Sequence, residues 1–234
     1  MKTVIVDERI DFKCESALTK KRFEIIKLPA CPILQKPVSA HPDMLLFIGK
    51  GKLLCHEKYY NIAPKEIDRI ISAGKLDLVI SDESLRGEYP FDVLFNAAAV
   101  GDKLICNARS VSKCLVDLYG EENVIKVKQG YAKCSTCTIG KNGIITADPS
   151  IAKAASAAGI DTLLLSESAT RLDGYDTGFI GGASGDDGEH IFFTGNVEAH
   201  PEFEKIREFC RKNGREAVSL SGAPLYDYGS LMFL

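Results

Sequence analysis

Residues 135–166 read STCTIGKNGIITADPSIAKAASAAGIDTLLLS, and this stretch contains the pattern that decides the fold. STCTIG and GIITAD are short apolar runs on either side of a tight turn, which is typical of two paired strands. Asp148 and Pro149 predict a helix start, and Gly159 predicts the end of that alanine-rich helix. The apolar run DTLLLS follows at once. The stretch therefore predicts a strand–strand–helix–strand unit.

The same unit occurs five times along the chain. The predicted first strands are MLLFIG (44–49), DVLFNA (92–97), STCTIG (135–140), DTGFIGG (176–182) and DYGSLMFL (227–234). The second strands are KLLCHE (52–57), KLICNA (103–108), GIITAD (143–148), HIFFTGN (190–196) and KTVIVDE (2–8). The third strands are LDLVIS (76–81), NVIKVK (123–128), DTLLLS (161–166), EAVSLS (216–221) and FEIIKLP (23–29). Helices are expected at 12–20, 64–74, 110–119, 149–159 and 201–214, between the second and third strands.

The fifth unit is divided between the two ends of the chain. Its first strand is the C-terminal one, and its second strand, helix and third strand are N-terminal. Repeats of this length indicate arrays or propellers. A divided unit favours a closed ring, because the last strand can then pair with the first and leave no free edge. We therefore predict an α/β fold, a five-bladed pseudo-symmetric ββαβ propeller that forms a single domain over residues 1–234.

Composition narrows the function classes. The chain has 234 residues, is 45% hydrophobic and has a formal net charge of −3, which gives no basic surface for nucleic acid. No apolar run is long enough for a membrane span, and acidic residues follow the N-terminal apolar run too soon for a signal peptide. We expect a cytoplasmic protein that binds neither membranes nor nucleic acid.

Eight cysteines raise the question of a metal or redox site. Most stand alone, and Cys55, Cys106 and Cys210 lie at core-like positions. Cys134 and Cys137 form a CxxC pair, but residues three apart on a strand point to opposite faces, so a shared ion or disulfide is disfavoured. The run GFIGGASG (178–185) is followed by no helix, and we expect a tight hairpin there rather than a phosphate loop. No metal or cofactor is predicted.

Aspartates precede or begin four of the five first strands: Asp43, Asp92, Asp176 and Asp227. In a closed ring, equivalent positions converge on the central axis. Each carboxylate can simply cap a turn. Alternatively, together they form an acidic mouth for a cationic ligand such as a guanidinium.

At this point the chain resembles the pentein fold of the guanidino-group modifying enzymes (GME), which include arginine deiminases, amidinotransferases and dimethylargininases. The segment Gly174–Phe179 is similar to the family motif His-x-Asp-Thr-x-Phe, in which the aspartate grips the guanidinium, and Asp176 matches that aspartate. Gly174 replaces the motif's histidine. The chain is most similar to an uncharacterised bacterial family assigned to this fold.

Other positions of the family pattern differ. The last strand contains no cysteine where the family has its nucleophile. Phe95-Asn96-Ala97-Ala98 stands where the family has Phe-Thr-Arg-Asp, and Lys133-Cys134-Ser135-Thr136 stands where it has Glu-Gly-Gly-Asp. Attack of a thiolate on a guanidinium needs the thiol, a proton donor and orienting carboxylates. Most of that set is therefore missing from its usual places.

Two hypotheses from different classes follow. In the first, a non-catalytic pentein binds a small cationic or amino-acid-like ligand in an acidic central pocket. Its size is also similar to that of translation initiation factor six, a ribosome-binding pentein, so a protein partner belongs to the same class, and homo-oligomers are compatible with it. In the second, the chain is a hydrolase or transferase with relocated machinery: Cys134 is the nucleophile, His41 or His200 the base, and Asp43 or Asp176 the orienting partner.

Overall fold

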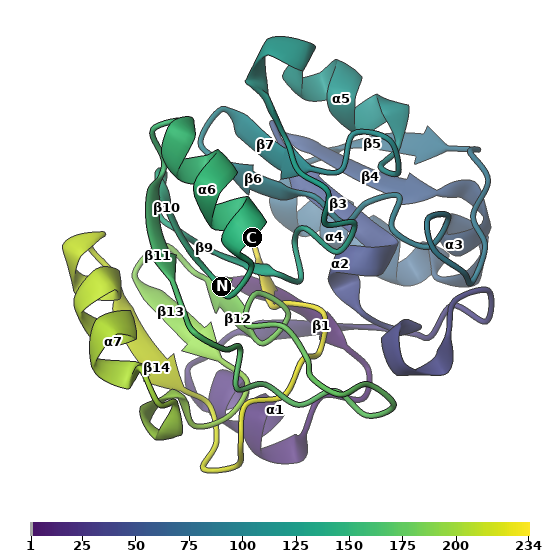
Figure 1. Ribbon diagram of the computed structural model, residues 1–234. Helices are drawn as coiled ribbons and strands as arrows, with labels where there is room; N and C mark the ends of the chain where they lie inside the picture. Colours follow the sequence, from purple (N-terminus) through teal and green to yellow (C-terminus); the bar gives the residue numbers. More distant parts are fainter. Residues whose placement is uncertain (1) are drawn as a thin grey trace.

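The computed structural model describes residues 2–234, and in that range fifteen strands form five three-stranded sheets (Figure 1). The sheets follow the chain order β15-β1-β2, β3-β4-β5, β6-β7-β8, β9-β10-β11 and β12-β13-β14. In each sheet the first two strands of the unit are antiparallel, and the second and third are parallel. The strands are β1 (Thr3–Asp7), β2 (Glu24–Leu28), β3 (Leu46–Gly49), β4 (Lys52–His56), β5 (Asp77–Ser81), β6 (Ala98–Val100), β7 (Lys103–Cys106), β8 (Val124–Lys126), β9 (Thr136–Ile139), β10 (Gly143–Thr146), β11 (Asp161–Leu164), β12 (Ser184–Asp186), β13 (His190–Phe193), β14 (Glu216–Ser219) and β15 (Met232–Phe233).

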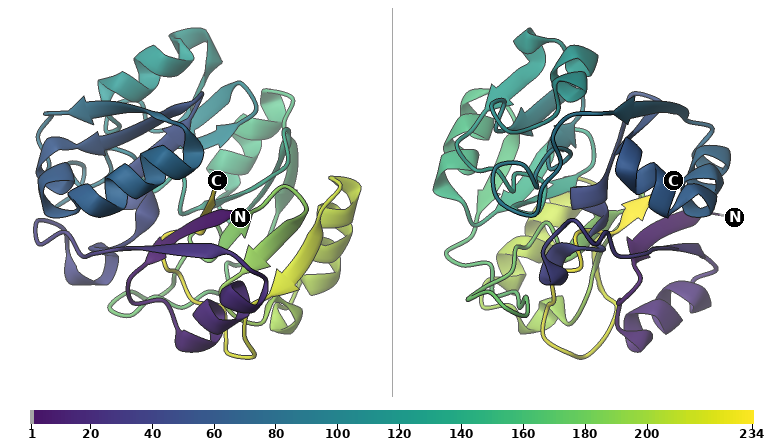
Figure 2. Two further views of the ribbon diagram at one scale, coloured as in Figure 1. Left: turned by 180° about the vertical axis from the view of Figure 1, so that it is seen from behind. Right: turned by 90° about the vertical axis from the view of Figure 1, so that its right-hand side faces the viewer.

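The ring closes as the sequence predicts. β1 lies between β15 and β2, with Val4 opposite Phe233 and Ile5 opposite Met232. The two end strands of the chain therefore lie side by side, near the middle in the view of Figure 1 and toward one side of the molecule in the right-hand view of Figure 2. This pairing confirms the ββαβ propeller with a fifth unit divided between the termini.

The helices lie around the outside of the strands, except for the short helix at Pro42–Leu45, whose residues are all buried (Figure 1). They are α1 (Phe12–Lys20), α2 (Pro42–Leu45), α3 (Glu57–Ile62), α4 (Pro64–Gly74), α5 (Lys113–Tyr119), α6 (Pro149–Ala157) and α7 (Phe203–Lys212), with single 3-10 turns η1 (Lys36–Val38), η2 (Glu121–Asn123) and η3 (Val197–Ala199). The predicted start of α6 is confirmed, because the Asp148 carboxylate accepts hydrogen bonds from the backbone N–H groups of Ser150 and Ile151. Each helix predicted between a second and a third strand is present, and the short helices α2 and α3 are additional. Every helix within residues 2–234 is too short or too polar to cross a bilayer.

Two predicted first strands are wrong. Residues 92–97 form turns, and the strand of that unit is β6, which starts at Ala98. The Asn96 and Ala97 N–H groups donate to carbonyls two or three residues earlier, so the backbone is already hydrogen-bonded locally and cannot join a ladder. The apolar side chains of this segment are buried in the core although the backbone is not extended.

Residues 176–182 are likewise not a strand, and β12 begins only at Ser184. The N–H of Phe179 donates to the Asp227 carboxylate instead of to a neighbouring strand. A Cβ on Gly181 would lie 2.4 Å from the Lys133 carbonyl oxygen, and one on Gly182 would lie 1.9 Å from Asp227. The glycines therefore serve close approach between segments, as the small residues suggested. The first strand of the first unit also starts later than predicted, after α2, and β15 is confined to Met232–Phe233.

The buried apolar residues form four clusters, and the largest contains Cys31, Cys55, Cys106 and Cys134. Cys137 lies in a different cluster with Cys210. The prediction that Cys55, Cys106 and Cys210 are core residues is confirmed, because each is fully buried. The two members of the CxxC pair thus lie in different parts of the core, but Cys134 belongs to the turn before β9 and not to the strand on which the prediction placed the pair.

Deletion of residues 228–234 tests the closure of the ring. This truncation removes β15 and the buried Leu231, and it leaves β1 with an unpaired edge. We expect the truncated chain to lose its cooperative thermal transition, measured by circular dichroism. Phe12→Ser is the matched control, because the Phe12 side chain is 78% exposed and its loss should leave the transition unchanged. A truncated chain that remains folded and monomeric would contradict the role of this pairing.

Candidate functional site

A polar cluster occupies the centre of the ring, inside the largest apolar cluster. Asp43 comes from α2, Cys134 from the turn before β9, and Ser230 from the turn before β15. All three side chains are at least 97% buried. The Cys134 sulfur lies 3.2 Å from each oxygen of the Asp43 carboxylate, and the Ser230 hydroxyl donates to the same carboxylate at 2.7 Å. We call these three residues and Asn96 the axial cluster.

Asn96 ties the axial cluster to the neighbouring backbone. Its Oδ1 accepts hydrogen bonds from the N–H groups of Lys133 and Cys134, at 2.8 and 3.2 Å. Its Nδ2 donates to the Asp43 carbonyl at 3.2 Å and to the Cys134 sulfur at 3.0 Å. One buried amide thus joins three units of the ring, and its donors and acceptor are all used.

The environment of Cys134 does not favour the thiolate. Burial raises the pKa of the Cys134 thiol well above its usual value, and the charges of Asp43 and Asp227 raise it further. The Asn96 amide opposes this effect but does not reverse it. A reactive cysteine normally has positive neighbours that lower its pKa. The thiol donates a hydrogen bond to the Asp43 carboxylate.

A second buried group of charges lies beside the axial cluster. The His41 side chain is 2% exposed and sits between two carboxylates, with Nε2 3.9 Å from Asp7 and Nδ1 3.8 Å from Asp227. Asp7 is paired with the Arg9 guanidinium, whose Nε donates to it at 2.9 Å. Burial raises the pKa of Asp227 to about 6, with a further contribution from Asp43 against the opposing effect of His41. A cavity of about 590 Å³ borders this group at His41, Arg9 and Tyr226.

The remaining predicted residues lie elsewhere. The Asp92 carboxylate accepts a hydrogen bond from the Tyr131 hydroxyl at 2.8 Å, and burial raises its pKa. His200 is buried, its Nδ1 accepts a hydrogen bond from the Glu202 N–H, and burial lowers its pKa. Asp176 is exposed on the connection between β11 and β12. Of the four predicted aspartates, only Asp43 and Asp227 lie together.

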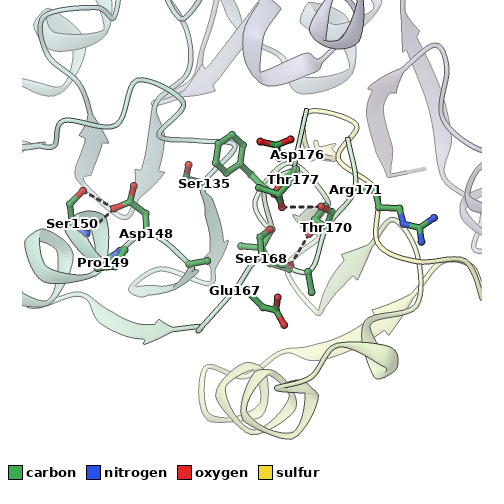
Figure 3. A pocket seen from close by; sticks show the side chains of 15 residues that line it. Ser135, Asp148, Pro149, Ser150, Glu167, Ser168, Thr170, Arg171, Asp176 and Thr177 are labelled. Carbon is green, nitrogen blue, oxygen red and sulfur yellow. Dashed lines mark hydrogen bonds between the residues drawn. The ribbon is translucent and has the colours of Figure 1, made fainter. Parts of the chain in front are cut away.

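A cavity of about 930 Å³ lies between the start of α6 and the connection 165–183 (Figure 3). We call it the side cavity. Asp148, Glu167 and Asp176 approach it from three directions, and the side chain of Arg171 points away from them (Figure 3). The floor includes Ser135, the residue after Cys134. The side cavity is therefore acidic and adjoins the axial cluster.

Unused hydrogen-bonding groups also border the side cavity. Within residues 2–234, the buried hydroxyls of Ser135 and Ser168 have no hydrogen-bond partner. Although burial opposes it, hydrogen bonds from the hydroxyl and backbone of Ser150 and from the Ile151 N–H lower the pKa of Asp148. That carboxylate is accordingly ionised at neutral pH. The Phe179 ring adds an aromatic wall. Carboxylates, free hydroxyls and a ring together suit a cation with hydrogen-bond donors.

Sequence reasoning found part of the site and missed part. It selected Cys134, Asp43, His41 and Asp227, which the fold brings to the centre of the ring. It did not select Asn96, although this is the one amide in the segment compared with the family motif Phe-Thr-Arg-Asp. It also did not select Glu167 or Asp148 as part of an acidic cavity, because neither stands at the head of a first strand.

Comparisons with known proteins agree on the fold. A family model described as "Family of unknown function (DUF6873)" matches residues 5–232. No curated protein matches the chain. Among solved structures, the chain is similar to the dimethylarginine dimethylaminohydrolase of Pseudomonas aeruginosa, with a TM-score of 0.56 and 9% identity over 94% of this chain and 92% of that one.

Two other similar structures differ in length. SxtG, an amidinotransferase from Microseira wollei, has a TM-score of 0.51 and 10% identity, with 94% of this chain and 88% of that one covered. ArgZ, an arginine dihydrolase from cyanobacteria, has a TM-score of 0.53 and 11% identity, with 93% of this chain and 36% of that one covered. At these identities the likeness shows the fold alone, which is the pentein fold of the guanidino-group modifying enzymes.

Asp227→Asn tests the buried charge beside His41. Because the folded state raises the pKa of Asp227 from 3.8 to about 6, folding favours the protonated carboxyl. The contribution of the protonated Asp227 carboxyl to the free energy of unfolding is complete below about pH 4. It is lost as the pH rises through about 6, which lowers the free energy of unfolding by on the order of 3 kcal/mol. Urea unfolding of the wild type and Asp227→Asn across this range should show the variant gaining relative stability as the pH rises.

The control for that experiment is Asp68→Asn, which changes an exposed carboxylate on α4. The stability difference between this control and the wild type should show no such change over the same pH range. A pH-independent difference for Asp227→Asn would contradict the raised pKa.

Iodoacetamide labelling tests the state of the axial thiol. Cys134 is 3% exposed and its pKa is raised, so we expect it to react much more slowly in the native protein than the partly exposed Cys114. Both thiols should react at similar rates in urea. Mass spectrometry of the labelled peptides measures both rates. Fast native labelling of Cys134 would show instead that it is an accessible thiolate.

Proposed function

The chain belongs to the family of unknown function DUF6873, and we propose that it binds a small cationic, amino-acid-like ligand in the side cavity. The observation that carries this proposal is the charge of that cavity. Asp148, Glu167 and Asp176 face it, and Arg171 is turned away (Figure 3). A cation entering the cavity would be drawn to three carboxylates, and a ligand with N–H groups could hydrogen-bond to them.

The uncharged lining supports the same class of ligand. Ser135 and Ser168 line the cavity, and their buried hydroxyls have no hydrogen-bond partner within residues 2–234. The Phe179 ring lines the same cavity and can pack against the face of a planar cation. Pockets of this kind, mainly apolar with a few placed polar groups, are typical of small-molecule sites.

The structural relatives support an amino-acid-like ligand. The dimethylarginine dimethylaminohydrolase of Pseudomonas aeruginosa was solved as a Cys-to-Ser mutant complexed with citrulline. That complex belongs to the relative. For this chain, the citrulline complex of the relative supports an amino-acid-like ligand. The two chains share one fold, and the side cavity adjoins the centre of the ring.

A second candidate function is a cysteine-dependent hydrolase or transferase that acts on a guanidino or amide group. It is favoured by one contact, the 3.2 Å approach of the Cys134 sulfur to the Asp43 carboxylate, which could accept the thiol proton. Against it stand the complete burial of the thiol and its raised pKa. His41, the nearer of the two candidate bases in the fold, contacts Asp7 and Asp227. This arrangement favours binding without turnover.

A thermal-shift screen tests the proposed binding. We expect arginine and agmatine to raise the melting temperature and uncharged citrulline to raise it less. At about 100 times the dissociation constant, the added stability would be about 2.7 kcal/mol. Asp176→Asn should remove most of this shift, since it deletes one of three charges on the cavity. Product analysis of each stabilising compound separates binding from catalysis.

Asp117→Asn is the matched control, because Asp117 is an exposed carboxylate on α5, outside the lining of the side cavity. Its shift should equal that of the wild type. Stabilisation that survives Asp176→Asn unchanged would place the ligand elsewhere. Turnover would support the second candidate, and a screen without any shift would favour a protein partner.

A further inference from the structure

A cavity smaller than the two described above lies among the innermost strands. It has a volume of about 180 Å³, and each sheet contributes one first strand to its wall. Phe47 of β3, Ala99 of β6, Thr138 of β9, Ser184 of β12 and Phe233 of β15 represent these strands. We call this cavity the central channel. Its lining is mainly apolar, with Ile48, Phe95 and Met232 among the other wall residues.

One lysine and one aspartate, Lys133 and Asp186, are the charged residues in the wall of this channel. Lys133 is partly buried and forms part of the channel wall. Its backbone N–H is held by Asn96 at 2.8 Å, so its position is fixed by the axial cluster. Its ammonium donates one hydrogen bond, to the Ser230 hydroxyl at 2.8 Å. Within residues 2–234, no carboxylate lies within 4.0 Å of this ammonium. An ammonium has three N–H donors, so two are left for another acceptor.

The nearby carboxylates already have partners. Asp43 is reached from Lys133 only through Ser230, whose hydroxyl donates to Asp43 at 2.7 Å. Asp186 also lines the central channel, but its Oδ1 accepts from Arg215 at 2.8 Å and its Oδ2 accepts from the Gly140 N–H at 2.6 Å. Asp186 therefore contributes a paired charge and not a free one. The Lys133 ammonium therefore has N–H donors that lack an acceptor in the described part of the chain.

Ser230 has a strained backbone conformation in this arrangement. It is not glycine, yet its φ is 75°, in the left-handed region. This backbone brings its hydroxyl between the Lys133 ammonium and the Asp43 carboxylate. The hydroxyl is thereby committed to both groups, and it cannot also satisfy the remaining donors of Lys133.

We infer that the central channel is a binding site for a small monocarboxylate with a short hydrocarbon tail. The carboxylate would accept charge-assisted hydrogen bonds from the Lys133 ammonium. The tail would lie among Phe47, Phe95 and Phe233, where it removes apolar surface from water. The ligand charge is opposite to the one proposed for the side cavity, so this is a separate site and does not rest on that proposal.

The walls also define what the channel excludes. A ligand with several charges, such as a phosphate ester, would bury charge against phenyl rings with a single lysine to pair it. A neutral amide of the same shape would fill the channel but would offer a weaker acceptor to the ammonium. A ligand of the channel needs both a single negative charge and a hydrocarbon tail. Inorganic anions lack the tail, and alcohols lack the charge.

Isothermal titration calorimetry with isovalerate, and with isovaleramide as its uncharged counterpart, tests this inference. We expect isovalerate to bind and isovaleramide to bind at least about tenfold more weakly. Lys133→Met keeps an unbranched four-atom stem and removes the ammonium, and it should weaken isovalerate binding by a similar factor. Lys141→Met, an exposed lysine in the turn between β9 and β10, is the matched control and should bind as the wild type does.

A second measurement guards against a variant that does not fold. Methyl NMR signals of Ile48, Leu231 and Met232 in the wild type should shift on addition of isovalerate, since all three residues line the channel. Binding that is unchanged in Lys133→Met, equal affinity for the amide, or the absence of shifts in these methyl groups would each overturn the inference. Asp176→Asn should leave isovalerate binding intact, so failure here is distinct from failure of the side-cavity proposal.

Discussion

The pairing of β15 with β1 is the constraint on which the rest of this structure depends. The two residues of β15, at the C-terminal end of the chain, pair with Val4 and Ile5 of β1. This short ladder converts a row of ββαβ units into a ring. The pairing completes the fifth three-stranded sheet, in which β1 would otherwise be an edge strand. It also brings Ser230, from the last turn, against Asp43 and Lys133, which are far away in the sequence. The polar centre exists only because the ring is closed.

That centre is costly to build, because it places carboxylates in an apolar core. Asp43 is compensated by Cys134 and Ser230, Asp7 by Arg9, and Asp227 by the N–H groups of Phe179 and Gly229 together with nearby His41. Buried polar groups are tolerated when their hydrogen bonds are made. The raised pKa of Asp227 shows where compensation is least complete. The side chains of the centre bond mainly to one another, and the cavities lie beside them.

Those two cavities have opposite chemistry. The side cavity presents three carboxylates from a helix start and a connecting segment, whereas the central channel presents one ammonium among phenyl rings. They meet at neighbouring residues, since Ser135 borders the first and Lys133 the second, with Cys134 between them. The axial cluster therefore separates an acidic space from a basic one. In this chain the turn 133–135 connects both cavities with the axial cluster.

The sequence by itself determined the number of units, the order of elements and the divided fifth unit, because apolar periodicity, helix caps and glycine stops are local signals. It could not place residues 92–97 and 176–182, whose apolar side chains mimic strands while their backbones bond to nearby carbonyls or to Asp227. It also could not show that Asp176 leaves the axis, or that Asn96 joins three units. Tertiary structure decided these points, because each depends on which distant segment comes within hydrogen-bonding distance once the ring closes.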